Sequence, residues 1–421
     1  MRLGKVCGFL MKAFLAVLML FVTAAAMEME VYDEDDLAYA IDEKCENIIL
    51  KGEYIPLDFL DQVVIDFDTV LNLNGNKLFS YFQITNGAQV TIKNGGFTAA
   101  GDPIIEVCGS DNEERPTVLI LENLKIEASR GIQINNDGYT RVEVNNTEMQ
   151  ALSYHGWCLH ISNAVEGNTG VDILVDGGDL FSAQGYVIEC NGDAEVSIKN
   201  AKLGGAAGIL MQAGSLTMEN TALVTENNST NPSIPTNAIT FMPATGANHV
   251  ILTLGPGNQI SSKSGAIFHI VPAAQGGVTA QIAITGGTFI TENGHPLFSA
   301  PEEIGKIVGI SGGSFPDISP EESAVLAPCL NDNMAVDEYG NIVAKSQEVG
   351  VIVIHPNEEN QTQSNPGTGA PINAIAQWLW SIVCWIHSQV RYTYSACYAI
   401  IFPKGEMRDE PKRVSGAAFI F

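Results

Sequence analysis

Apolar and polar residues alternate along most of this chain, and one short phrase interrupts the alternation again and again. The phrase reads apolar, polar, Asn or Gly, any residue, any residue, apolar. Its copies are LNGNKL (73–78), IKNGGF (92–97), LENLKI (121–126), VNNTEM (144–149), VDGGDL (175–180), IKNAKL (198–203), MENTAL (218–223), ITGGTF (284–289) and ISGGSF (310–315), with the looser LGPGNQI at 254–260. Such internal self-similarity predicts a stacked-repeat architecture.

The spacing of the copies indicates a β-solenoid. Their first residues lie 19, 29, 23, 31, 23, 20, 36, 30 and 26 positions apart. A mean of about 26 suits one coil with loops of unequal length, and the copies predict about ten coils. Alternation within each strand sends every second side chain inward. The Asn or Gly after the strand suits a turn with left-handed backbone, where an amide ladder is expected from Asn94, Asn123, Asn146, Asn200 and Asn220.

The start of the mature chain predicts a cap for this solenoid. Residues 27–62 lack the phrase; acidic residues Asp33–Asp36 precede Leu37 and Ala40, which share one helical face, and the strand-like Asn47–Leu50 follows. Acidic residues favour the beginning of a helix. A cap of this kind covers the exposed first coil and prevents edge-to-edge association.

The remaining segments follow from composition. The solenoid is predicted for residues 63–345 and closes with a hairpin at Val336–Val343. Residues 1–26 predict a signal peptide, because a basic flank precedes an apolar core and a run of three alanines. The other predicted segments are a linker (346–371), an uncharged hydrophobic helix (372–390) and a tail (391–421). For the hydrophobic helix, insertion into a membrane and packing on the end of the solenoid both stay open.

Charge and cysteine content narrow the function classes. The formal net charge is −27, which argues against nucleic acid and anionic membranes as partners. There is no CxxC pair, so zinc and redox motifs are absent and the cysteines are expected to be buried or unpaired. No cofactor and no metal site is predicted, and Ca²⁺ is the one ion that the acidic charge would suit.

Several segments resemble the right-handed parallel β-helix, the pectin-lyase-like fold of secreted surface proteins of Gram-positive bacteria. They are Asp36–Leu50, Leu71–Gly75, Val90–Phe97, Ile310–Phe315 and Asp337–Val343. The resemblance covers about residues 31–345 and implies an all-β chain. That fold hosts lyases, hydrolases, esterases and non-catalytic proteins, so it does not choose a function.

A second resemblance concerns the C-terminal region. Asn365–Gly369 (NPGTG) is similar to the NPxTG variant of a sortase sorting signal, which implies attachment to the cell wall through Thr368. A plain Pro-Gly-Thr-Gly linker is the other interpretation. Together with the leader, this segment predicts an extracellular protein that is held at the cell surface, in the cell wall or by a membrane anchor.

Motifs of the known enzymes with this fold are missing. Polygalacturonase-type hydrolases would be expected to show Asn-Thr-Asp, Asp-Asp, Gly-His-Gly and Arg-Ile-Lys; the predicted coils contain none of these, and the one Asp-Asp pair, Asp35-Asp36, lies in the predicted cap. Pectate lyases would be expected to show calcium carboxylates beside a basic residue. The predicted coils contain three arginines, Arg115, Arg130 and Arg141, none of which is in register with an evident Asp cluster.

One column of outward residues carries the candidate chemistry. Aligning the second strands of successive coils places Glu106, Gln133, His160 and Glu189 in line at spacings of 27, 27 and 29 residues. His160 and Glu189 would form an acid/base pair. Glu106 and Gln133 are the candidate substrate-binding residues on the same face, and the column continues through Leu210, Thr240 and His269. A solvent-facing polar ladder without function is the alternative.

Aromatic residues just before His160 complete this candidate site. Tyr154, His155 and Trp157 would give a sugar ring a stacking platform. Glu106 and Glu189 would lie three coils apart, about 14 Å, which exceeds the separation of the two carboxyl groups in ordinary glycosidases. The favoured function is therefore a non-enzymatic surface scaffold, adhesin or glycan-binding module whose partner is a polysaccharide or a cell-surface glycan. A polysaccharide lyase or glycoside hydrolase is the alternative.

Overall fold

The computed structural model describes residues 27–52, 54–56, 62–99, 103–162, 170–226, 236–271, 278–299, 304–316 and 318–345. The chain divides into two compact units, Met1–Gln347 and Glu348–Phe421, and every described residue belongs to the first. The predicted signal peptide, linker, hydrophobic helix (372–390), tail and Thr368 lie outside the described residues.

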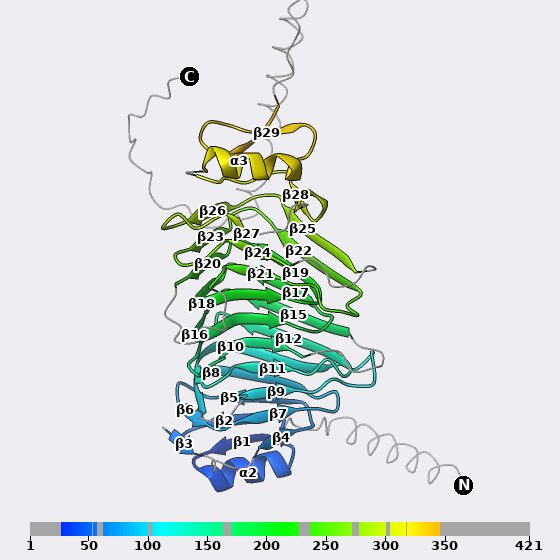
Figure 1. Cartoon of the computed structure of the whole chain (residues 1–421). Helices are drawn as coiled ribbons and strands as arrows, with labels where there is room; N and C mark the ends of the chain where they lie inside the picture. Colours follow the sequence, from blue (N-terminus) through cyan, green and yellow to red (C-terminus); the bar gives the residue numbers. More distant parts are fainter. Residues whose placement is uncertain are drawn as a thin grey trace, which may run out of the picture. The chain divides into compact units, whose positions relative to one another are not determined.

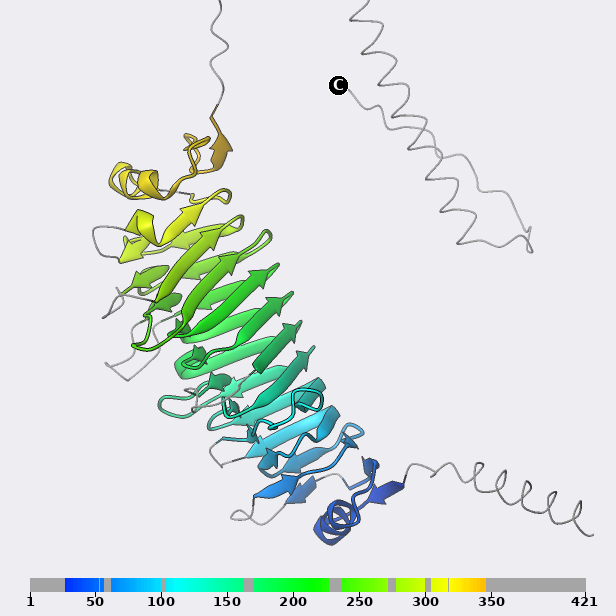
Figure 2. The ribbon, with the colours of Figure 1, turned by 90° about the vertical axis from the view of Figure 1, so that its right-hand side faces the viewer.

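The described unit is a stack of parallel strands, and strands make up 53% of it against 8% helix. The all-β prediction is thus confirmed as a parallel β-solenoid. Pairing joins 28 strands into one sheet, which turns two corners, so each coil contributes to three parallel ladders. Figure 1 shows the strands stacked in chain order from blue to yellow, and Figure 2 shows the same order from the side.

Ladder A contains the strands that carry the first half of the repeat phrase. They are β1 (Glu28–Val31), β2 (Asn47–Leu50), β5 (Thr69–Asn72), the first halves of β8 (Gln89–Ala99) and β10 (Thr117–Ala128), β12 (Tyr139–Asn145), β15 (Gly170–Asp176), β17 (Glu195–Lys199), β19 (Gly214–Glu219), β22 (His249–Leu254), β25 (Thr279–Ile284) and β28 (Val308–Ile310).

Ladder B follows the first corner and holds the last residue of each phrase. It contains β3 (Tyr54–Pro56), β6 (Lys77–Phe79), the second halves of β8 and β10, β13 (Glu148–Ala151), the first parts of β16 (Asp179–Cys190) and β18 (Lys202–Met211), β20 (Ala222–Thr225), β23 (Gln259–Ser262) and β26 (Thr288–Thr291).

Ladder C is built from the predicted second strands. It contains β4 (Val63–Ile65), β7 (Phe82–Ile84), β9 (Ile105–Val107), β11 (Ile132–Ile134), β14 (Leu159–Ile161), the last residues of β16 and β18, β21 (Ile239–Phe241), β24 (Phe268–Ile270) and β27 (Phe298–Ser299). The alternation pattern predicts two strands per coil, and the structure has three. The third strand arises because the phrase bends at its Asn or Gly and continues as ladder B.

The register confirms the repeat with one exception. Ile92, Leu121, Val144, Val175 and later first residues of the phrase pair with one another along ladder A. The prediction that Leu73 begins the first copy in register was wrong, because Leu71 pairs with Ile92. Two extra residues in that turn restore the alignment by the end of the phrase.

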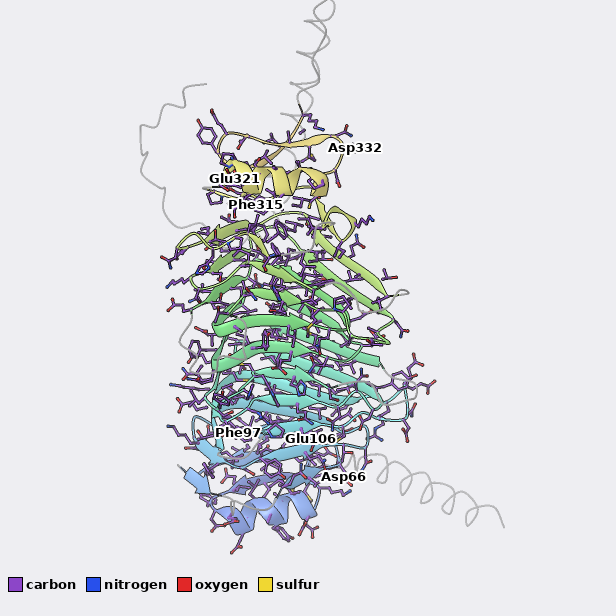
Figure 3. The ribbon with its side chains drawn as sticks, in the orientation of Figure 1. Asp66, Phe97, Glu106, Phe315, Glu321 and Asp332 are labelled. Carbon is purple, nitrogen blue, oxygen red and sulfur yellow. The ribbon has the colours of Figure 1, made fainter. Side chains whose placement is uncertain are left out.

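The core is one continuous apolar column inside the three ladders. The inward residues of each phrase are fully buried, and aromatic rings stack between neighbouring coils. Ring centroids of Phe289 and Phe315 lie 4.9 Å apart, those of Phe268 and Phe298 also 4.9 Å, and those of Phe82 and Phe97 5.3 Å. Figure 3 labels Phe97 among the lower coils and Phe315 beneath the closing helix.

The predicted N-terminal cap is present. Helix α2 (Glu34–Asp42) begins after Asp33, whose carboxylate accepts a hydrogen bond from the backbone N–H of Asp36 at 3.0 Å. This bond satisfies one of the free donors at the helix start. Leu37 and Ala40 are fully buried and belong to the common core, so α2 closes the first coil.

The C-terminal end is closed by elements that were only partly predicted. The hairpin of β29 (Met334–Val336) and β30 (Ile342–Ala344) is antiparallel as expected. Before it lie the 3₁₀ turns η1 (Ile304–Lys306) and η2 (Ala327–Cys329) and the short helix α3 (Pro320–Leu326). Helix α3 was not predicted, although Ser319 and Glu322 form a capping box at its start. This helix is short and not apolar.

The turns between ladders A and B explain the Asn residues of the phrase. Asn94, Asn123, Asn146, Asn200 and Asn220 all have positive φ, between 47° and 60°. The predicted amide ladder is only partial within the described turns: Asn146 Nδ2 donates to Asn123 Oδ1 at 2.8 Å, whereas Asn200 donates to Asp176. Backbone conformation, rather than a continuous amide stack, is therefore what these positions share.

This explanation predicts different effects of two substitutions at Asn146, which is exposed and has φ +47°. Asn146→Ala should lower the free energy of unfolding by about 1–2 kcal/mol, because an L side chain without a polar group resists this conformation. Asn146→Gly should cost clearly less. Urea denaturation of both variants checks this; equal losses would show that the amide bond, not the backbone, sets the requirement.

Candidate functional site

The outer residues of ladder C lie in the predicted column. Pairing places Glu106 beside Gln133, Gln133 beside His160 and His160 beside Glu189. The column then continues through Leu210, Thr240, His269 and Ser299. Their neighbours in each strand point inward and are fully buried, as Leu159 and Ile161 are on either side of His160. The register predicted for this face is thus confirmed, while the roles of its residues remain proposals.

Glu106 and Gln133 belong to a network of side-chain amides. The Glu106 carboxylate accepts hydrogen bonds from Gln62 Nε2 at 3.1 Å, Gln83 Nε2 at 3.0 Å and Asn135 Nδ2 at 2.7 Å. Gln133 Nε2 in turn donates to Asn135 Oδ1 at 2.9 Å. Figure 3 labels Glu106 on this part of the stack. These bonds tie neighbouring coils together, so a ligand at Glu106 or Gln133 must compete with contacts inside the ladder.

His160 and Glu189 occupy the next two positions and face the same side. His160 Nε2 lies 3.9 Å from Glu189 Oε2, and the two side chains are 21% and 19% exposed. This distance is too long for a hydrogen bond. His160 Nε2 instead contacts Asn191 Nδ2 at 3.1 Å. The acid/base pair expected from the sequence is therefore brought together, with Asn191 as a third member that sequence reasoning missed.

Two polar atoms of this group are buried without a partner: His160 Nδ1 and Asn191 Oδ1. If the Asn191 amide donates to His160 Nε2, the ring proton sits on Nδ1 and has no acceptor. If the amide is turned over, its oxygen accepts from Nε2–H, and Nδ1 becomes an acceptor without a donor. Buried polar atoms normally have partners. A hydroxyl group or a water molecule, which both donates and accepts, satisfies either arrangement.

Burial also changes the protonation of the pair. It raises the pKa of Glu189 to about 7, against the opposing effect of the Arg130 charge. Burial and Arg130 together lower the pKa of His160. His160 is consequently neutral at pH 7, whereas a large fraction of Glu189 carries a proton. A carboxyl group that exchanges its proton near neutral pH is suited to general acid catalysis and to donating a hydrogen bond.

Arg130 and Trp157 border the pair on the side where the ladder C strands begin. The guanidinium carbon of Arg130 lies 5.9 Å from the Trp157 ring centroid, within the range of a cation–π contact. The Trp157 and His160 rings are 5.0 Å apart. Trp157 is only 5% exposed, so its ring supports His160 and offers no open face to a sugar, contrary to the platform expected from the sequence.

Tyr154 and His155 sit on the turn before Trp157 and are exposed. Tyr154 is 52% exposed, and its ring packs edge-on against His155 at 4.7 Å. His155 has φ +61°, a conformation that costs energy in a residue other than Gly or Asn. The turn is closed by a hydrogen bond from Gly156 N to Ser153 O at 2.8 Å. Tyr154 is the aromatic residue of the predicted platform that is available for stacking.

An irregularity on the other side of the pair was not visible in the sequence. The pairing of β16 with β18 shifts register between Ser182 and Tyr186, a bulge of the kind common near binding sites. Beyond it, Tyr186, Ala207 and Leu210 form an apolar cluster separate from the main core, with Met242 packed against it. The only sequence signal was Leu210, which interrupts the polar column one strand after Glu189. A smaller irregularity follows Leu254, where the looser copy of the phrase has one residue more than the copies paired with it on either side.

Metal and thiol chemistry find no support in the described residues. No group of three or more His, Cys, Asp or Glu side chains there is arranged to hold a metal ion, so no site is assigned to Ca²⁺. The described cysteines are all free thiols. Burial raises the pKa of Cys158 and of Cys190 to about 12, which makes both unsuitable as nucleophiles at neutral pH.

No protein-family model, curated protein or solved structure matches the chain. Among the helices that the structure describes, none is long and apolar enough to cross a membrane.

The raised pKa of Glu189 predicts a pH-dependent effect of Glu189→Gln on stability. Between about pH 4.5 and 7 the unfolded chain releases this proton while the folded chain keeps it, so wild-type stability falls as pH rises. A shift from 4.5 to about 7 is worth about 3 kcal/mol. Glu189→Gln should therefore stabilise the protein by up to about 3 kcal/mol at pH 8 and have little effect at pH 4.

Urea denaturation of both proteins at pH 4 and pH 8 measures this difference. His160 is present in both, so its own titration largely cancels. An equal effect of Glu189→Gln at the two pH values would contradict the proposed burial of this carboxyl group.

Proposed function

We propose that this chain is an exported, right-handed parallel β-helix of the pectin-lyase-like kind that binds a carbohydrate on the outer face of ladder C. The right hand is the one expected for parallel strands joined by crossover connections. Binding would center on His160, Glu189 and Asn191, with Tyr154 as the stacking residue. The preferred biological role is a surface scaffold or adhesin that presents this face to a polysaccharide or a cell-surface glycan.

The observation that carries the proposal is the grouping of His160, Glu189 and Asn191, with His160 Nε2 3.9 Å from Glu189 Oε2 and 3.1 Å from Asn191 Nδ2. Sugar hydroxyl groups both donate and accept hydrogen bonds, so they suit an imidazole, a carboxyl group and an amide whichever way the Asn191 amide is turned. Tyr154 adds an exposed aromatic ring on the adjoining turn, and such rings pack against the apolar face of a sugar ring. Small polar groups beside one aromatic ring are typical of ligand sites.

The scaffold supports binding because its strands hold the site rigidly. His160 lies in β14, which pairs on both sides, with β11 and with the end of β16. Side chains fixed by neighbouring strands lose little freedom when a ligand binds, which favours affinity. The predicted leader and the sorting-signal-like NPGTG segment around Thr368 agree with a role outside the cell, as does the acidic net charge of −27.

A carbohydrate-active enzyme is the second candidate, and one observation favours it. Glu189, with its pKa raised to about 7, lies 3.9 Å from His160. A hydrolase with two carboxylates is disfavoured, because Glu106 is three strands away from Glu189 in the ladder. A polysaccharide lyase needs one base that removes a carbon-bound proton and one acid that protonates the leaving oxygen; neutral His160 and protonated Glu189 have these states.

A glycan array with product detection tests the proposal. Wild-type protein should bind a defined set of glycans without releasing products, and Tyr154→Ala should weaken binding about tenfold through loss of the stacking contact. His160→Ala should abolish it. Tyr339→Ala is the matched control, because Tyr339 is exposed on the closing hairpin and should bind as wild type does. Product release that disappears in His160→Ala would favour the enzyme; binding that survives in both Tyr154→Ala and His160→Ala would refute this site.

A further inference from the structure

A cavity adjoins the His160 group at the corner between ladders C and A. Its volume is about 380 Å³, a size within the range of small-molecule sites. Its walls come from three successive turns, which lead from β16 to β17, from β18 to β19 and from β21 to β22. The residues that matter for its chemistry are Asn191, Asp193, Ala213, Thr245, Gly246 and Asn248.

Small residues keep this cavity open. Ala213 forms one wall, and Gly246 has φ +89° with no atom within 4 Å of where a Cβ would stand. The turn that holds Gly246 is fixed by hydrogen bonds from Ala247 N to Ala244 O at 3.2 Å and from Ala244 N to Gln212 O at 2.9 Å. The cavity is therefore a product of backbone turns that are themselves hydrogen-bonded to neighbouring coils.

Polar groups suited to hydroxyl recognition line the cavity. The Asp193 carboxylate accepts a hydrogen bond from Asn248 Nδ2 at 3.3 Å and lies 3.5 Å from His249 Nε2. The backbone oxygen of Asp193 accepts from the buried side chain of Asn136 at 3.1 Å, which fixes this turn. A carboxylate, two side-chain amides and the Thr245 hydroxyl offer both donors and acceptors, as a neutral sugar or another polyol requires.

Asn191 belongs to both sites. Its Nδ2 contacts His160 Nε2 at 3.1 Å, and its side chain is among those that line the corner cavity. A sugar at His160 and a second sugar in the cavity would thus meet at one side chain. Two adjacent units of one glycan chain can occupy the His160 site and the corner cavity together. A free monosaccharide can occupy only one of these two sites.

We infer that the corner cavity is a second sugar subsite, which holds the unit next to the one bound at His160 and Glu189. This inference rests on the proposed glycan-binding function and specifies its ligand as an oligosaccharide of at least two units. Asp193 and Asn248 bind the second unit, Thr245 borders it, and Asn191 joins the two subsites.

The test uses an array that carries each sugar as a monosaccharide and as its linear di-, tri- and tetrasaccharide, probed with the full-length protein. Wild type should bind the disaccharide at least about tenfold more tightly than the monosaccharide. Asn248→Ala and Asp193→Asn should bind the disaccharide no more tightly than the monosaccharide and should still bind the monosaccharide as wild type does. His160→Ala should bind neither sugar. Thr245→Trp, which fills the mouth of the cavity, should act as Asn248→Ala does.

Asn333→Ala is the matched control, since Asn333 is exposed near the closing hairpin, outside both sites; circular dichroism checks the folding of each variant. If Asn248→Ala, Asp193→Asn and Thr245→Trp all keep the full gain for the disaccharide, the second subsite is refuted and the His160 site stands. If no sugar of any length binds the wild type, the proposed function fails, and this inference fails with it.

Discussion

In-register stacking of parallel coils is the constraint on which the rest of this structure depends. Each strand takes its hydrogen bonds from the coil before and the coil after it, so equivalent residues lie one above another about 4.8 Å apart. The inward positions of the repeat phrase are then apolar in coil after coil, as the fully buried Ile92, Leu121, Val144 and Val175 are. This requirement explains why the phrase repeats. A shift of one residue in the pairing would turn the apolar side chains of a strand outward.

The same constraint aligns outward residues whether or not they have a function. Glu106 in the outward column of ladder C finds its hydrogen-bond partners within the solenoid, because three side-chain amides donate to its carboxylate. The group at His160, Glu189 and Asn191 differs, because burial raises the pKa of its carboxyl group to about 7 and keeps that group partly protonated. The bulge in β16 and the apolar cluster around Leu210 lie directly beside it. Local departures from regular stacking therefore coincide with this partly protonated carboxyl group.

Sequence periodicity predicted the solenoid, its N-terminal cap and the register of ladder C, because these depend on which residues are apolar and how far apart they lie. It failed where the count of turn residues matters, since nothing in LNGNKL shows that Leu71 rather than Leu73 pairs with Ile92. Helix α3 was missed although Ser319 and Glu322 carry its signal. The burial of Trp157 and the contact of Asn191 with His160 depend on how neighbouring coils pack. A single sequence does not show this packing.

The central claim is that a sugar binds through its hydroxyl groups to His160 and Asn191. A crystal structure of the protein in complex with a tight-binding oligosaccharide tests this most directly. The expected result is sugar density within hydrogen-bond distance of His160 and Asn191, with a ring packed against Tyr154. Density for the oligosaccharide on another face, with His160 and Asn191 bridged only by a water molecule, would contradict it.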